Sequence, residues 1–370
     1  MSIFNQPWKL VQNQIRSPGG YAMDIFRQRE NPKDIPNGSE AWVGSLTRAR
    51  GANEKCPNFG CAETILPDGR QMYLFEAIAL SPEEVLGKAH IEKFGNELGV
   101  LVKLLDAKNQ YFLQAHPTRP TAMKLWNSPY GKEEAWHVIA LREGTEEPPY
   151  ILLGFKPGVT VDQFKELYYN ASLKDLELLC HKIPVKPGET YFVPGGIPHA
   201  LGAGCLVIEI QEPSDLAVIA IPQDELIDFR RKAAPNAIFY PEDNDLYEDR
   251  LFKTFVFDGA EKEEVLKRTR STEPVLRQGD WGTEYVLVGN ESTSYFACTK
   301  AVVNGGSMPL HHTGDVRIGI VIRGSGSFRY QGGEINIRQG DEFFLPYNVG
   351  KTCLCGDVEV FFAHPAGVNY

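Results

Sequence analysis

The sequence predicts a protein dominated by β-structure and built from two related β-barrels with a small helical insertion. Most segments are short runs of Val, Ile, Leu, Phe and Tyr that Gly or Pro interrupts about every 8–12 residues, and the chain contains 35 Gly and 25 Pro. Lys186–Pro194 and Arg338–Pro346 share the pattern Gly-acidic-x-aromatic-Phe-apolar-Pro, which indicates an internal repeat. At 370 residues the chain is also longer than one hydrophobic core usually spans, so we expect two domains.

The expected strands follow in order along the chain, and two helical stretches interrupt them. Ser81-Pro82-Glu83-Glu84 begins the first, at about 81–95, because Ser at the N-cap and Pro at the first helical position favour a helix start. The second, at about 159–183, has helical apolar spacing and ends before Pro184. The strand candidates are Gln71–Ala79, Tyr111–Ala115, Ala135–Leu141, Tyr191–Val193, Leu206–Gln211, Ile318–Ile322, Ser327–Tyr330 and Val358–His364.

A charged, turn-rich stretch over residues 222–249 has the composition of a linker or of surface structure. We therefore place the domain boundary near residue 250. Residues 1–249 then form the first domain with both helical insertions, and residues 250–370 form the second.

Composition narrows the class of partner. The formal net charge is −10 and the sequence pI is about 5.4, which argues against nucleic acid or an anionic membrane as a partner. No apolar stretch approaches the roughly 20 residues that cross a bilayer, and the N-terminus lacks a secretory signal pattern. The seven cysteines exclude a fully paired disulfide scaffold. We expect a cytoplasmic protein that acts on a small molecule; its oligomeric state stays open.

One set of side chains in the first half has the character of a metal site. Gln114 and His116 are two residues apart, so a strand would place both on one face. Glu134 enters another strand, and His199 follows the turn in Gly188-x5-Pro194-x-Gly196-x2-His199. Each residue alone is more often structural. Together, two imidazoles, a carboxylate and an amide favour Zn²⁺ over Ca²⁺ or Mg²⁺. A zinc ion with an open coordination position would polarise a substrate carbonyl.

These residues belong to motifs that together resemble the type I phosphomannose isomerases (mannose-6-phosphate isomerases) of the short bacterial type. The resemblance covers about residues 40–215, and more loosely the rest of the chain. It implies two cupin (jelly-roll-like) β-barrels, of which the first binds a metal and the second does not. It also implies a zinc-dependent enzyme that interconverts mannose 6-phosphate and fructose 6-phosphate. The motifs are Gln114-Ala115-His116-Pro117, Gly131-Lys132-x-Glu134-x-Trp136, Pro194-x-Gly196-x2-His199-Ala200 and Glu209-x-Gln211-x2-Ser214-Asp215.

The resemblance also implies residue roles. One Zn²⁺ per chain would be held by Gln114, His116, Glu134 and His199. The reaction would move a proton between C1 and C2 of the open-chain sugar through an enediol(ate), with Glu209 as base or proton relay and Lys132 beside it. Lys103, Lys132 and Asp215 are the expected substrate-binding residues, although Glu209 and Asp215 each have a structural alternative. A lysine among apolar strand residues, such as Lys103, is costly to bury without an anion, unless it extends to solvent.

Two positions depart from the family pattern. Phe112 stands where the family has a serine that helps hold the phosphate, and Ile219 stands where it has an arginine considered catalytic. Neither side chain donates hydrogen bonds. Either another arginine reaches the site, with Arg119, Arg142, Arg230 and Arg231 as candidates, or the substrate differs. The alternatives are a metal-dependent cupin isomerase or epimerase for a different sugar, phosphorylated or not, a non-catalytic sugar-binding cupin, and an iron-dependent cupin dioxygenase.

The second half is expected to hold no metal. His311-His312 with Asp315 superficially resembles a metal motif. In the repeat after Gly340, however, Lys351 falls where His199 stands in the first half. A protonated lysine is a poor ligand at neutral pH.

Overall fold

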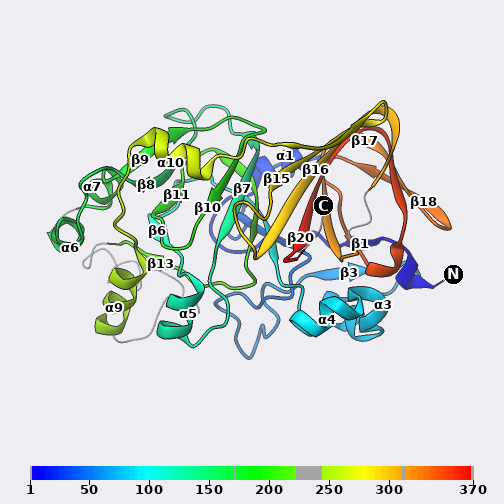
Figure 1. Cartoon of the computed structure of the whole chain (residues 1–370), viewed down its shortest axis with the longest axis horizontal. Helices are drawn as coiled ribbons and strands as arrows, with labels where there is room; N and C mark the ends of the chain where they lie inside the picture. Colours follow the sequence, from blue (N-terminus) through cyan, green and yellow to red (C-terminus); the bar gives the residue numbers. More distant parts are fainter. Residues whose placement is uncertain (1, 171, 222–243, 311–313, 368–370) are drawn as a thin grey trace.

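The structure, a computed structural model, describes residues 2–170, 172–221, 244–310 and 314–367. Its described strands form three antiparallel sheets (Figure 1). The central sheet has the order β10 (Thr190–Val193), β7 (Glu134–Leu141), β12 (Cys205–Gln211), β5 (Leu101–Asp106), β2 (Glu40–Val43). The outer sheet has the order β13 (Val218–Ile219), β6 (Gln114–Ala115), β11 (His199–Leu201), β8 (Tyr150–Phe155), β9 (Cys180–Pro184).

The third, C-terminal sheet is the largest and also contains three strands from the N-terminal part of the chain (Figure 1). β1 pairs with β19, and β3 pairs with β1. In order, its strands are β14 (Val275–Gly279), β15 (Gly282–Val288), β16 (Phe296–Pro309), β20 (Thr352–Pro365), β17 (Arg317–Tyr330), β19 (Glu342–Leu345), β1 (Trp8–Leu10), β3 (Glu63–Ile65) and β4 (Gln71–Tyr73), with β18 (Gly333–Arg338) paired to β17.

The fold is therefore cupin-like in its dominance by sheet, as expected. Each sheet of the described residues is open at its ends, so closure into two barrels stays a prediction. The domain boundary near residue 250 also stays a prediction; residues 222–243 of the expected linker lie outside the described part of the chain.

Short helices lie around the sheets, and within the described ranges every helix is too short or too polar to span a lipid bilayer. Both expected helical stretches contain helices, α3 and α4 in the first and α6 and α7 in the second. The helices are α1 (Tyr21–Phe26), α2 (Leu74–Ala79), α3 (Pro82–Leu86), α4 (Lys88–Phe94), α5 (Arg119–Trp126), α6 (Val161–Asn170), α7 (Leu173–Glu177), α9 (Asn244–Thr254) and α10 (Lys262–Thr269), with 3-10 turns at Ile3–Asn5 and Tyr347–Val349.

Two local predictions were wrong. The strand expected over Gln71–Ala79 ends at Tyr73 and continues as α2, which buries Leu74, Ala77 and Ile78. That spacing is the helical period, which the run of apolar residues obscured. The second helical stretch ends at Glu177, because Cys180–Pro184 pairs with β8 as strand β9.

The central sheet is buried on both faces. Along β12, Ile208 and Ile210 pack into a core shared with Phe361 of the C-terminal sheet. Val207, on the opposite face, packs with Leu153 of the outer sheet. Because side chains alternate along a strand, Glu209 must share the face of Val207 and point between the central and outer sheets. A carboxylate buried there needs a charged partner or a ligand.

A buried ion pair joins the residue that follows α1 to the C-terminal sheet. Arg27, which follows α1, donates from Nε (2.9 Å) and Nη2 (2.6 Å) to one Glu342 oxygen on β19, and the two side chains are 0% and 2% exposed. We expect Arg27→Met to lower the free energy of unfolding by about 3–5 kcal/mol, because it leaves the Glu342 charge buried without its partner. Urea unfolding followed by circular dichroism measures this.

The matched control is Arg29→Met. Arg29 also pairs with a carboxylate, that of Asp24, but its side chain is 37% exposed. Its loss should change stability by less than about 1 kcal/mol. Equal effects of the two substitutions would contradict the importance assigned to the Arg27–Glu342 pair.

Candidate active site

Two rows of side chains face each other between the central and outer sheets. Direct cross-strand partners share a face of their sheet, and on the outer sheet His199 is paired with both Leu153 and Gln114, while Gln114 is also paired with Ile219. On the central sheet the corresponding row is Trp136, Glu209, Lys103 and Trp42, one from each of four neighbouring strands. A cavity of about 1100 Å³ lies between the rows and is lined by both.

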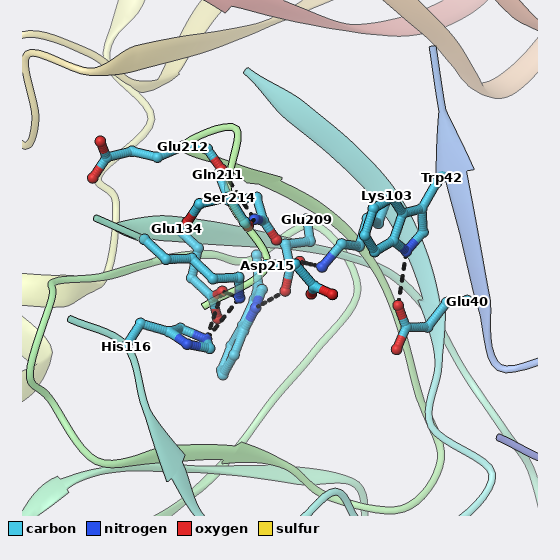
Figure 2. A network of polar contacts seen from close by, with 12 residues as sticks. Glu40, Trp42, Lys103, His116, Glu134, Glu209, Gln211, Glu212, Ser214 and Asp215 are labelled. Atoms are coloured by element: carbon cyan, nitrogen blue, oxygen red, sulfur yellow. Dashed lines mark hydrogen bonds and ion pairs between the residues drawn. The ribbon is translucent and has the colours of Figure 1, made fainter. Parts of the chain in front are cut away.

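Three of the predicted metal ligands form one group, and His116 of that group lines this cavity. His116 Nε2 lies 3.1 Å from Glu134 Oε2, and His199 Nε2 lies 3.5 Å from Glu134 Oε1. One donor atom from each residue lies within 4.8 Å of the others, and all three residues are buried. Figure 2 shows His116 and Glu134 directed toward one another. Gln114, the fourth predicted ligand, is the cross-strand neighbour of His199 and lines the same cavity.

A hydrogen bond at the other ring nitrogen holds each imidazole in the tautomer that can bind a metal ion. His116 Nδ1 donates to the Leu216 carbonyl and His199 Nδ1 donates to the Ile197 carbonyl, each at 2.9 Å. Each ring must therefore carry its proton on Nδ1 and present a lone pair on Nε2. Burial, together with the Lys132 charge, lowers the pKa of His116 to about 3, and burial lowers the pKa of His199. Both rings are neutral at physiological pH.

The donor atoms fit a divalent cation. Glu134 Oε1 and His199 Nε2 are buried without a hydrogen-bond partner, and two lone-pair acceptors cannot bond each other. Burial raises the pKa of Glu134, but Lys132 and His116 outweigh it and hold that pKa well below its usual range. The Lys132 ammonium contacts Glu134 Oε2 and lies 2.7 Å from His116 Nε2. Two of the three donor residues thus already have a positive charge beside them, as they would with a bound cation. Two imidazoles, a carboxylate and an amide suit zinc.

Loop contacts explain the spacing of the ligand motifs. The Gly196 amide donates to the His116 carbonyl (2.7 Å), and the Lys132 amide donates to the Pro117 carbonyl (3.0 Å). Gly196 has φ of +88°, in the left-handed region that favours glycine. The three motifs thus fold against one another through their backbones, which brings His116, Glu134 and His199 to one point.

Glu209 lies beside this cluster with its orientation set by two donors. Lys103 Nζ donates to its Oε1 (2.8 Å) and the Trp136 indole donates to its Oε2 (3.1 Å). The Trp136 ring in turn packs edge-on against His199, with ring centroids 5.4 Å apart. In Figure 2, Glu209 lies between the His116–Glu134 pair and Lys103. Burial lowers the pKa of Lys103, but the Glu209 charge outweighs it, so that pKa is raised.

Sequence reasoning missed Trp42 and three residues that line the cavity, Glu40, Arg16 and Arg50. Glu40 and Trp42 lie on β2, where the Trp42 indole donates to Glu40 (2.9 Å). Arg16 and Arg50 lie in loops outside every motif, and both line the cavity. Asp215, predicted to bind substrate, lines the cavity too and accepts hydrogen bonds from the Arg16 guanidinium and, at 2.8 Å, from the Arg50 amide. For Glu40 and Trp42, an acid two residues before a tryptophan in a strand was a weak sequence signal. No sequence pattern indicated the two arginines.

The arginines considered as replacements at the site lie elsewhere or are not described. Arg119 donates to Glu212 (2.6 Å), and Arg142 donates to Asp106 and Asp34 (2.7 Å each). Neither lines the cavity. Arg230 and Arg231 lie outside the described residues. Phe112 and Ile219 both line the cavity, so the two departures from the family pattern place apolar surface there.

The second half offers no comparable centre among the residues described. Among the described residues, three His, Cys, Asp or Glu donors cluster at His116, Glu134 and His199 alone, in the first half of the chain. Asp315 accepts from His364 Nδ1 (2.8 Å), while His311 and His312 lie outside the described residues. All seven cysteines are free thiols.

Comparison with known proteins identifies relatives of this chain. Residues 290–365 match the family described as mannose-6-phosphate isomerase, cupin domain. The chain is also 28% identical over 287 residues to the mannose-6-phosphate isomerase of Streptococcus mutans, covering 76% of this chain and 80% of that protein. The chain is thus similar to mannose-6-phosphate isomerases over about three quarters of its length, and its C-terminal part matches their cupin domain.

Solved structures of mannose-6-phosphate isomerases share the fold over nearly the whole chain. The Bacillus subtilis enzyme superposes with a TM-score of 0.73 at 23% identity, covering 97% of this chain and 99% of that one. The Salmonella typhimurium enzyme, in a structure with fructose 6-phosphate and zinc, gives a TM-score of 0.71 at 16% identity, covering 98% and 100%. At these identities the likeness establishes the fold alone.

Proposed function

We propose that this chain is a zinc-dependent aldose–ketose isomerase that interconverts mannose 6-phosphate and fructose 6-phosphate. The observation that carries the proposal is the buried His116, Glu134 and His199 group, which contains two donor atoms without a hydrogen-bond partner and whose His116 lines the same cavity as Glu209. A metal site beside an oriented carboxylate supplies the two groups that proton transfer next to a carbonyl requires. We propose one zinc per chain, held by these three residues and Gln114, with a metal-free second domain.

Similarity to mannose-6-phosphate isomerases supports the choice of substrate. The Streptococcus mutans relative is named a mannose-6-phosphate isomerase, and the Salmonella typhimurium structure of the same fold contains fructose 6-phosphate and zinc. In that reaction the carbonyl moves between C1 and C2 of the open-chain sugar while one carbon-bound proton moves the opposite way. When bound, zinc would polarise the carbonyl and stabilise the developing oxyanion.

The chain's own residues would then move the protons. In the direction of fructose 6-phosphate, Glu209 takes the proton from C2, which leaves an enediol(ate), and returns it to C1. Lys103 and the Trp136 indole hold the Glu209 carboxylate in place, as the hydrogen bonds above indicate. Lys132, beside the ligand cluster, carries a positive charge where oxyanion character develops and can shuttle the proton between the two hydroxyl oxygens.

Metal removal tests the proposal directly. We expect dialysis against a chelator to lower the rate of mannose 6-phosphate isomerisation by more than about a hundredfold, because the oxyanion loses its main stabilisation. Stoichiometric Zn²⁺ should restore the rate, whereas Mg²⁺ should not, because it prefers oxygen ligands. Elemental analysis before and after dialysis accompanies the assay. Full activity in metal-free protein would contradict the proposal.

A second candidate is an isomerase for an unphosphorylated sugar, which Phe112 and Ile219 in the cavity lining favour. Comparing kcat/KM for mannose 6-phosphate and for mannose separates the two. The first proposal predicts a preference for the phosphorylated sugar of at least about a hundredfold, since charge-assisted hydrogen bonds to phosphate each contribute about 1.5–3 kcal/mol. Binding without turnover of either sugar would instead indicate a sugar-binding protein.

A further inference from the structure

Two arginines meet at one carboxylate in the cavity wall. Asp215 accepts from the Arg16 guanidinium, and Arg50 approaches it with its backbone amide (2.8 Å) and with Nε (3.5 Å). Burial raises the pKa of Asp215, but the charges of Arg16 and Arg50 outweigh it and hold that pKa well below its usual range. The side chains of Arg16 and Arg50 are 23% and 28% exposed, so both guanidinium groups remain accessible from the cavity that they line.

Arg16 lies at the last strand of the central-sheet row, and the first residue of that row packs on a metal ligand. Trp136, which packs on His199, begins the row that continues through Glu209 and Lys103 to Trp42. Trp42 is three strands from Trp136, a separation of about 14 Å at the usual strand spacing. The Arg16 guanidinium and Lys103 Nζ both lie 5.0 Å from the centre of the Trp42 rings. Positive charge therefore gathers around Trp42, on the last strand of the row.

The charges of the site match a dianion. Four cationic side chains, Arg16, Arg50, Lys103 and Lys132, accompany four carboxylates, those of Glu40, Glu134, Glu209 and Asp215. The side chains alone are balanced, and a divalent cation at the ligand cluster leaves two positive charges in excess. A phosphate monoester carries close to two negative charges at pH 7. A guanidinium also matches phosphate geometry with paired hydrogen bonds.

The backbone at Arg16 is a second, independent sign of a specialised position. Its φ is +67°, in the left-handed region that residues with a Cβ adopt at a cost of about 1–2 kcal/mol. Such conformations persist where surrounding contacts impose them, often at binding sites. Here the contacts are those of the Arg16 side chain with Asp215, Glu40 and the Trp42 ring.

We propose that Arg16 and Arg50, positioned by Asp215, form the phosphate-binding subsite of this enzyme and replace the anion-binding groups missing at Phe112 and Ile219. The inference rests on the proposed sugar-phosphate substrate. The metal cluster would receive the carbonyl end of the open-chain sugar, and the arginine pair would receive the phosphate end. Asp215 acts here as a positioning residue that keeps both guanidinium groups directed into the cavity.

The test compares two non-reacting probes, D-glucitol 6-phosphate and D-glucitol, by calorimetry with the zinc-loaded protein. For Arg50→Gln and Arg16→Gln we expect affinity for D-glucitol 6-phosphate to fall at least about tenfold, the effect of losing one charge-assisted hydrogen bond. Affinity for D-glucitol should not change. In the isomerase assay, KM for mannose 6-phosphate should rise similarly, with kcat within about threefold of the unsubstituted enzyme.

Arg29→Gln is the matched control, since Arg29 also pairs with a carboxylate but does not line the cavity. It should alter neither probe. If the Arg16 variant does not fold, as judged by thermal unfolding, the partly exposed Arg50 variant carries the test. Equal weakening of both probes, or unchanged binding of D-glucitol 6-phosphate, overturns the subsite. An unsubstituted protein that prefers the phosphorylated probe but isomerises nothing refutes the proposed function and leaves the subsite standing.

Discussion

Replacing His199 by alanine is expected to remove the metal and to lower kcat/KM by at least about a thousandfold. His199 Nε2 is one of the two buried donor atoms without a hydrogen-bond partner, and its Nδ1 is already committed to the Ile197 carbonyl. Alanine deletes the ligand and leaves Glu134 Oε1 without any group opposite it. Elemental analysis of the purified variant and an isomerase assay with mannose 6-phosphate measure the two effects.

His181→Ala is the control for this prediction. His181 is also a buried histidine of the outer sheet, and its Nε2 pairs with the Ala260 carbonyl at 2.8 Å, but it lies outside the His116, Glu134 and His199 group. We expect this variant to lose stability while it keeps its zinc content and kcat. A His199→Ala protein that binds zinc stoichiometrically, or loses less than about tenfold in kcat/KM, would remove the basis for the metal-dependent mechanism.

Replacing Glu209 by glutamine is expected to lower kcat by about 10²–10⁴, the usual contribution of a general base. Glutamine has the same shape and keeps a carbonyl oxygen for Lys103 or the Trp136 indole, yet it cannot accept a proton from carbon. Zinc content should stay unchanged. Exchange of the substrate C2 hydrogen with deuterated solvent, followed by NMR, should fall in parallel with kcat.

Glu40→Gln provides the matched comparison. Glu40 lines the same cavity and accepts from the Trp42 indole, but it lies on β2, three strands from Trp136 in the central sheet. Its substitution should act mainly on KM through Trp42 and Arg16. If Glu209→Gln loses less than about fivefold in kcat and still exchanges the C2 hydrogen, Glu209 holds Lys103 in place and the base must be sought elsewhere.

Much of the candidate site was within reach of sequence reasoning because its residues sit in short motifs. Gln114 and His116 are two apart, Lys132 and Glu134 are two apart, and His199 follows a Gly-Pro turn. Such spacings depend only on local backbone geometry, which the sequence pattern reveals. The convergence of His116, Glu134 and His199 on one point followed from the family resemblance, since the three belong to strands or turns of different sheets.

Sequence reasoning failed where an apolar run had more than one interpretation. Leu74–Ala79 was expected to be strand, although its buried residues are spaced as in a helix. Cys180–Pro184 was expected to be helix, and it became strand because β8 offered an unpaired edge. In each case the outcome depended on which surface the segment packs against, which a local window does not contain.

By its own pattern, the sequence determined the dominance of β-structure, the resemblance to a known family, and the types of side chain available for a metal and a base. Tertiary structure alone decided that Arg16 and Arg50, from loops without any motif, share a cavity with those groups, and that Arg119 and Arg142 do not. The physical reason is that strand pairing and burial join residues distant in the chain, as when β2 pairs with β5 or β13 with β6. Side chains brought together in this way need no regular spacing along the sequence.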